Sequence, residues 1–176
     1  KLLDLGWGSG AYLKYFYTKG YRNLHGIDPD KELLAKIPPK IAKVKVAFAE
    51  KLPYDDKSFD VVFVYGVLHH LKGLASYDLC MKEINRVLKK GGYIFIMEPG
   101  QWFFFRSMET LVDFLSIFSK GFKQFSEILA EERKEQHFFI KNHRVFRNYF
   151  VRNKYKIMAN TYFVYSWIFT ARKVQD

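Results

Sequence analysis

The first ten residues of the sequence constrain the fold more than any other stretch. A short apolar run typical of a buried strand, Leu-Leu-Asp-Leu, is followed at once by Gly-Trp-Gly-Ser-Gly. Glycine lets the backbone bend tightly and approach a ligand where a Cβ atom would collide. Tyr12, Leu13 and Phe16 then recur at helical spacing, so the free N–H groups at the start of that helix should face the same turn. The stretch therefore predicts a strand, a ligand-binding turn and a helix.

Asp28 follows at the end of a second predicted strand, about twenty residues after the turn, which is the offset of an acidic residue that accepts ribose hydroxyls. Asp28 is equally suited to cap a helix beginning at Pro29, and the two roles are compatible. With Ala11 as its last member, the turn fits a dinucleotide pattern as well as an S-adenosylmethionine (SAM) pattern. The turn alone leaves both ligands open.

Strand-like and helix-like segments alternate up to residue 98, which predicts an α/β fold with a doubly wound, mostly parallel sheet. The predicted strands are 1–5, 22–28, 43–48, 59–65 and 93–98, and the predicted helices are 10–20, 29–37 and 74–90, the last ended by Gly91 and Gly92. From 99 to 152 the alternation gives way to an amphipathic helical pattern, which predicts a helical insertion. Its apolar stripes either belong to the core or form a lid over the substrate. Residues 153–176 are rich in aromatic and β-branched residues and predict a β-hairpin.

Four further motifs follow the glycine turn in order. They are Phe-Ala-Glu-Lys-Leu-Pro-Tyr at 48–54, Ser-Phe-Asp-Val-Val at 58–62, Val-Leu-His-His-Leu at 67–71 and Glu-Ile-Asn-Arg-Val-Leu-Lys-Lys-Gly-Gly at 83–92. Together the motifs closely resemble the class I SAM-dependent methyltransferases of the type 11 group, over residues 1–98. The resemblance implies a Rossmann-like core at 1–98, an insertion after the fifth strand, and an antiparallel C-terminal strand that completes the sheet.

The resemblance also implies SAM as cofactor, with S-adenosylhomocysteine as its product. Asp4 would orient the methionine ammonium, Asp28 would bind both ribose hydroxyls, and an apolar clamp would hold the adenine. The cofactor-binding residues expected on this basis are Asp4, Gly6, Trp7, Gly8, Gly10, Asp28, Pro29, Phe48, Ala49, Glu50, Leu52, Tyr65 and Val67.

Two residues depart from the group's pattern at the expected cofactor site. Trp7 stands where the group usually has a small residue, so its indole could either cover the cofactor or narrow the pocket. Phe48 stands where an aspartate usually accepts from the adenine amino group, so that contact is either lost or supplied by Glu50. These departures keep open the alternative of a SAM-binding or interaction protein without catalytic activity.

His69 and His70 follow the fourth predicted strand, where the resemblance places the backbone near the transferable methyl group. A histidine titrates near neutral pH and can remove a proton from an attacking hydroxyl or amine, so both are candidate catalytic bases. A purely structural role for the pair is an equal alternative. Tyr65 and Glu98 are the other polar candidates.

The formal charge of +11 is concentrated over residues 133–156, where eight Lys or Arg face a single acid, Glu135, and aromatic residues are interleaved. One interpretation is a solvated helical face with buried rings; the other is a surface for an anionic partner such as RNA. The expected acceptor is accordingly a small-molecule or lipid-like compound, anionic or aromatic, with tRNA or another RNA as the alternative.

Cys80 is the only cysteine, which excludes an intrachain disulfide and a cysteine metal site and favours a reducing, cytoplasmic compartment. No metal is expected, and no signal peptide is visible. The most apolar run, 102–118, is interrupted by Arg106, Glu109 and Asp113, so no transmembrane segment is expected.

Overall fold

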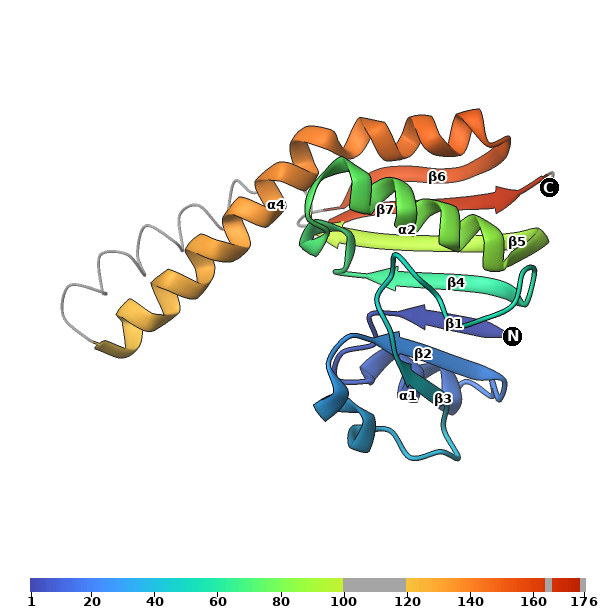
Figure 1. Ribbon diagram of the computed structural model, residues 1–176, viewed down its shortest axis with the longest axis horizontal. Helices are drawn as coiled ribbons and strands as arrows, with labels where there is room; N and C mark the ends of the chain where they lie inside the picture. Colours follow the sequence, from blue (N-terminus) through green and yellow to red (C-terminus); the bar gives the residue numbers. More distant parts are fainter. Residues whose placement is uncertain (100–119, 164–165, 175–176) are drawn as a thin grey trace.

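The computed structural model describes residues 1–99, 120–163 and 166–174. Within these ranges seven strands form one sheet in the order β3-β2-β1-β4-β5-β7-β6 (Figure 1). The first five strands pair in parallel, and β7 lies antiparallel between β5 and β6. The strands are β1 Leu2–Leu5, β2 Leu24–Asp28, β3 Lys43–Val46, β4 Phe59–Tyr65, β5 Leu88–Pro99, β6 Tyr155–Phe163 and β7 Ser166–Lys173. The predicted doubly wound, Rossmann-like methyltransferase fold with an antiparallel C-terminal strand is confirmed.

Helices cover both faces of this sheet (Figure 1). Helix α1, Ala11–Thr18, packs with β1 and β2 over a core cluster that contains Leu13 and Leu24. Helices α2, Gly73–Val87, and α4, Lys120–Arg152, contribute to the larger cluster on the opposite face. Alternate residues of β4 show the division, because Val62 and Val64 belong to the larger cluster while Phe63 packs against the smaller one.

The predicted helix at 29–37 is wrong in type. The segment forms only a short 3-10 helix, η1, over Lys31–Lys36, because Pro38 and Pro39 leave too few residues for a stable α-helix. Its cap is Asp30, whose side chain accepts from the backbone N–H of Glu32 at 2.9 Å. The prediction that Asp28 caps this helix is therefore also wrong, and both Asp28 oxygens have other donors, described below.

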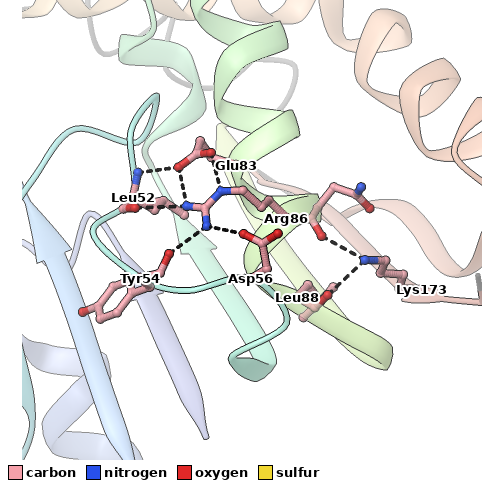
Figure 2. A network of polar contacts seen from close by, with 8 residues as sticks. Leu52, Tyr54, Asp56, Glu83, Arg86, Leu88 and Lys173 are labelled. Carbon is pink, nitrogen blue, oxygen red and sulfur yellow. Dashed lines mark hydrogen bonds and ion pairs between the residues drawn. The ribbon is translucent and has the colours of Figure 1, made fainter. Parts of the chain in front are cut away.

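The predicted end of the long helix at Gly91 and Gly92 is wrong as well. Helix α2 ends at Val87, and the glycines lie inside β5, which is longer than predicted. The reason is the buried Lys173 of β7, whose ammonium donates to the carbonyls of Asn85 and Leu88 at 2.9 and 3.0 Å (Figure 2). A cation at these last carbonyls stabilises the helix end without a glycine cap.

Helix α4 is part of the core at its C-terminal end. Phe139 and Phe150 are buried against Trp167 and Phe169 of β7, respectively, and the buried Phe146 packs against Phe139. The described part of the helical insertion predicted for 99–152, apart from Pro99 in β5, is the helix Lys120–Arg152, and its last turns belong to the sheet-covering layer. The apolar run at 102–118 lies outside the described residues. In the parts of the chain that are described, no helix is both long and apolar enough to cross a membrane.

Candidate cofactor and active site

A cavity of about 620 Å³ opens at the carboxyl ends of β1, β2 and β4, the edge where open parallel sheets bind ligands. Most of the residues predicted for the cofactor meet here, together with His70. The residues that line the cavity are Gly6, Gly8, Ile27, Asp28, Pro29, Phe48, Ala49, Glu50, Gly66, Val67, His70, Leu71, Lys72 and Ser76. Five of these, Ile27, Gly66, Leu71, Lys72 and Ser76, were not predicted, although each lies within six residues of one that was.

The glycines of the turn serve different purposes. All three have a positive φ, and a Cβ on Gly6 would lie 2.3 Å from the Val67 side chain. Gly6 therefore allows the turn to approach the segment after β4. A Cβ on Gly10 would lie 2.0 Å from Ile37, so Gly10 lets α1 pack closely and does not line the cavity. In the described part of the chain, and apart from its two sequence neighbours, no atom lies within 4 Å of a Cβ on Gly8, which leaves that backbone open to a ligand.

Asp28 is held at the cavity wall by two backbone donors. Its Oδ2 accepts from the N–H of Gly8 at 2.9 Å, and its Oδ1 accepts from the N–H of Asp30 at 3.0 Å. The carboxylate is thus oriented across the glycine turn, while each oxygen retains a further lone pair for a ligand hydroxyl. This geometry fits a ribose.

Asp4 lies buried behind the turn, 1% exposed, and does not line the cavity. Burial, followed by the nearby negative charge of Asp28, raises the pKa of Asp4 to about 7. Its Oδ2 has no hydrogen-bond partner within the described part of the chain. A buried carboxylate oxygen without a donor is costly, so the site is suited to a cationic group such as the ammonium of SAM.

The wall expected to face the adenine is formed by Phe48, Ala49 and Glu50 in the loop after β3. The Phe48 ring is 66% exposed at the cavity, which makes it available for contact with a flat ligand. Leu52, predicted for this site, is instead buried in the core and does not line the cavity.

A polar network on α2 fixes this loop (Figure 2). Glu83 accepts from the N–H of Leu52 at 2.7 Å, and Arg86 donates to the Leu52 and Tyr54 carbonyls and to Asp56. Arg86 also forms a two-pronged ion pair with Glu83 at 2.7 and 2.8 Å. This hydrogen bonding holds the Arg86 pKa above its usual value. The motif at 83–92 therefore supports the loop wall without touching the cavity.

Trp7 and Tyr65 lie away from the cavity. The Trp7 indole is 4% exposed and packs in the smaller core cluster over Gly26, where an added Cβ would lie 2.7 Å from the ring. The indole therefore neither covers nor fills the cavity. Tyr65 packs its ring against Tyr12, with centroids 4.9 Å apart.

The two histidines of the segment η2, Leu68–His70, have different environments. His69 is buried, and its Nδ1 lies 2.7 Å from Oε2 of the buried Glu98. The other Glu98 oxygen accepts from the N–H groups of Val67 and Leu68, both at 2.8 Å. Glu98 and His69 therefore hold η2 in place. Of the two histidines, His70 lines the cavity, and its Nδ1 lies 2.6 Å from Oε2 of Glu135 on α4.

The basic segment at 133–156 divides by burial. Phe146, Phe150 and Tyr155 are buried, whereas Arg144 and Arg147 are exposed. This arrangement matches the interpretation of a solvated face over buried rings.

Across the described ranges, no group of three or more His, Cys, Asp or Glu side chains is placed to hold a metal ion. Cys80 is fully buried, and burial raises the pKa of its thiol.

The sheet order, with β7 antiparallel between β5 and β6, and the cavity at the carboxyl ends of the parallel strands match the fold of the class I SAM-dependent methyltransferases. The model of the family described as methyltransferase domain, the type 11 group, matches residues 3–96, and the chain belongs to this family.

Two groups of relatives accompany this match. A demethylmenaquinone methyltransferase from Chlorobaculum tepidum is 36% identical over 101 residues, covering 56% of this chain and 40% of the relative. A ubiquinone/menaquinone biosynthesis C-methyltransferase from Chromobacterium violaceum is 43% identical over 58 residues, covering 33% and 22%. The matched stretches take in less than half of these relatives' own length.

Solved structures agree with the fold. A SAM-dependent methyltransferase from Methanosarcina mazei superposes with a TM-score of 0.67 at 21% identity, over 99% of this chain and 92% of that chain. A SAM-dependent methyltransferase from Mesorhizobium loti has a TM-score of 0.64 at 16% identity, over 98% and 90%. At such identities the similarity supports the architecture and leaves the acceptor open.

Proposed function

We propose that this protein transfers a methyl group from SAM to a small-molecule acceptor. The observation that carries the proposal is the cavity in which the open backbone of Gly8, the oriented carboxylate of Asp28 and the apolar wall of Phe48 and Ala49 converge. When bound, SAM supplies an electrophilic methyl group on a sulfonium. The protein then needs mainly to position the two reactants, since displacement at a methyl carbon requires no covalent help.

The cofactor roles follow from the environments of the side chains. Asp28 would accept both ribose hydroxyls, and Asp4 would attract the methionine ammonium from behind the turn. Phe48 and Ala49 would pack on the adenine, and Glu50 is the side chain at that wall able to accept from its amino group. Gly6, Gly8, Pro29 and Val67 would contribute backbone and apolar contacts.

His70 is the favoured catalytic base, because it lines the cavity whereas His69 is buried with Glu98. An imidazole there can take the proton that a hydroxyl or carbon acceptor loses as it attacks. Neither Tyr65 nor Glu98 lines the cavity, which leaves His70 the best supported of the predicted polar candidates.

A compact aromatic acceptor, quinol-like and able to become anionic, is favoured over RNA. The relatives from Chlorobaculum tepidum and Chromobacterium violaceum are named for quinone methylation. RNA binding would need exposed rings for stacking, but Phe146, Phe150 and Tyr155 are buried. The non-catalytic alternative is based on both Trp7 and Phe48, and it loses support because Trp7 lies in the core and does not fill the pocket.

Titration calorimetry with SAM, S-adenosylhomocysteine and NAD tests the proposed cofactor. We expect the first two to bind and NAD to show no heat of binding. Binding of NAD without SAM would overturn the proposal. Transfer of a labelled methyl group would then be followed with a panel of quinols and with a mixed tRNA pool at two salt concentrations. Tight, steeply salt-dependent tRNA binding would favour the RNA alternative.

A further inference from the structure

A second, smaller cavity of about 190 Å³ lies beside the cofactor cavity, between η2, the start of α2 and helix α4. The two cavities share His70, Leu71 and Lys72, so they meet at the same wall. The far wall of the smaller cavity is formed by Lys134, Glu135 and Phe138 of α4. A ligand there would lie next to a cofactor in the larger cavity, with His70 at the junction.

His70 is oriented from α4 by Glu135. A carboxylate can only accept, so the 2.6 Å contact between Nδ1 of His70 and Oε2 of Glu135 requires Nδ1 to carry the proton. In the neutral imidazole the basic lone pair is then on Nε2. Glu135 also stabilises the positive charge that His70 acquires when it takes a proton.

The position of Glu135 is fixed by the core. Phe139, one helical turn further along α4, is 1% exposed and packs against Trp167 with ring centroids 5.7 Å apart. Phe138 stacks parallel to Tyr77 of α2, with centroids 5.8 Å apart. Both contacts hold this part of α4 against the fold, so Glu135 is presented to His70 by a rigid element.

We propose that this smaller cavity is the acceptor site, that it takes an aromatic hydroxy compound such as a quinol, and that Glu135 is a positioning residue for His70. The inference rests on the proposed methyl transfer. Phe138 and Leu71 supply apolar walls for a ring, and Lys72 and Lys134 supply positive charge that favours the oxyanion of the acceptor.

The step balances without a further reactant. As the acceptor attacks, its hydroxyl or ring C–H proton passes to Nε2 of His70. One bond forms between the acceptor atom and the methyl carbon, and the bond between that carbon and sulfur breaks. The positive charge lost from sulfur is carried by the His70 imidazolium, stabilised by Glu135, until the proton leaves to water.

The test compares Glu135→Ala with Glu127→Ala, an exposed acid on the same helix. Nitrogen NMR of ¹⁵N-histidine protein, with the His70 signal assigned by His70→Gln, reports which ring nitrogen is protonated. We expect Nδ1 in the wild type and in Glu127→Ala, and a shift toward Nε2 in Glu135→Ala. Affinity for S-adenosylhomocysteine should stay within about twofold in both variants, because neither acid lines the cofactor cavity.

Methyl transfer to 1,4-naphthoquinol, kept reduced under nitrogen, supplies the second readout. Turnover should fall roughly 10–100-fold in Glu135→Ala, the scale of loss when an orienting partner is removed, and stay unchanged in Glu127→Ala. Equal turnover in the two variants, or an unchanged His70 tautomer, would overturn the positioning role. A wild type that binds SAM but leaves the naphthoquinol unmethylated would overturn the acceptor class, whereas failure to bind SAM would overturn the proposed function itself.

Discussion

The backbone N–H of Gly8 donates to Oδ2 of Asp28 at 2.9 Å and so joins the glycine turn after β1 to the carboxyl end of β2. The bond spans twenty positions of sequence, but both residues lie on the wall of one cavity. The carboxylate is therefore already oriented before a ligand arrives, and a ribose would find its acceptor in place at little entropic cost.

Replacement of Asp28 should weaken cofactor binding. Asp28→Ala removes the acceptor of the ribose hydroxyls and should cost ~1–3 kcal/mol of SAM binding free energy, the scale of hydrogen bonds to a charged group. Calorimetry measures this directly. The exposed Asp55 lies outside the cavity, so Asp55→Ala is the matched control. Equal SAM affinity in both variants would remove Asp28 from the site.

Asp4 should make stability depend on pH in the absence of ligand. The pKa of Asp4 is about 7 in the folded protein, compared with the ordinary value of 3.8 that applies to the unfolded chain. The folded state therefore holds the proton more tightly. The free energy of unfolding should fall as pH rises from about 4 to about 7 and then level off. A shift of this size corresponds to at most about 4 kcal/mol.

Asp4→Asn should remove that dependence, as measured by urea unfolding between pH 4 and pH 8. Saturating SAM should also reduce the slope in the wild type, because its ammonium favours the ionised carboxylate. A slope that persists in Asp4→Asn would assign the dependence to other groups.

His25 should act in the opposite direction. Burial first, then the positive charges of Lys1, Lys43 and Lys45, lower its pKa from 6.5 to about 4. The unfolded state therefore binds more protons between these values, and stability should be lost as pH falls from about 6.5 to about 4. His25→Phe should flatten this acid limb in thermal unfolding curves. The control is His137→Phe, at an exposed position. The same loss of stability at low pH in both variants would contradict the prediction.

The two neighbouring histidines should separate catalysis from stability. His70→Ala should lower turnover by roughly 10²–10⁴-fold with a much smaller change in SAM affinity, as expected for loss of a general base. His69→Ala leaves the buried Glu98 without its imidazole partner and should mainly lower the melting temperature. Full turnover in a stably folded double variant would indicate an acceptor that is already deprotonated.

Arg86 should matter for the loop that carries Phe48. Arg86→Lys keeps the charge but loses the planar fork that reaches Glu83, Asp56 and two carbonyls. We expect a loss of ~1–3 kcal/mol in unfolding free energy and weaker SAM binding. The exposed Arg144→Lys on α4 should change neither. Unaltered SAM affinity in Arg86→Lys would show that the loop holds its position without this network.

The sequence predicted correctly those helices, strands and turns whose residue pattern is contained within the element itself. The strand, turn and helix at 1–18 and the acidic residue at the end of β2 followed from spacing alone. The sequence could not show that Asp30 and not Asp28 caps η1, since either residue suits a cap. Nor could it show that Lys173, 85 residues from Leu88, would end α2 before its glycine pair. The sequence also left open whether the Trp7 indole enters the cofactor pocket. The indole packs in the core because Gly26, which has no side chain, leaves space for it, and this contact is not visible in the local pattern.

Glu135 could not be predicted as a partner of His70, since 65 residues separate them and the contact depends on how α4 docks. The only sequence signal was that this acid stands alone in a basic segment. Similarly, Glu98 was only a weaker candidate for the catalytic base. Its three partners, two backbone N–H groups and one imidazole, lie in a segment about thirty positions away.

The contacts of Glu98 show that the region matched by the family model is shorter than the region needed to support the candidate active site. The family match ends at residue 96, two positions before the carboxylate that secures η2. Glu98 itself lies in β5, which pairs with β4 on one side and with Trp167 to Arg172 of β7 on the other. A minimal fragment cut to the matched region would keep the glycine turn but lack the support for His69 and His70. Domain boundaries drawn for expression should therefore extend at least through the C-terminal hairpin.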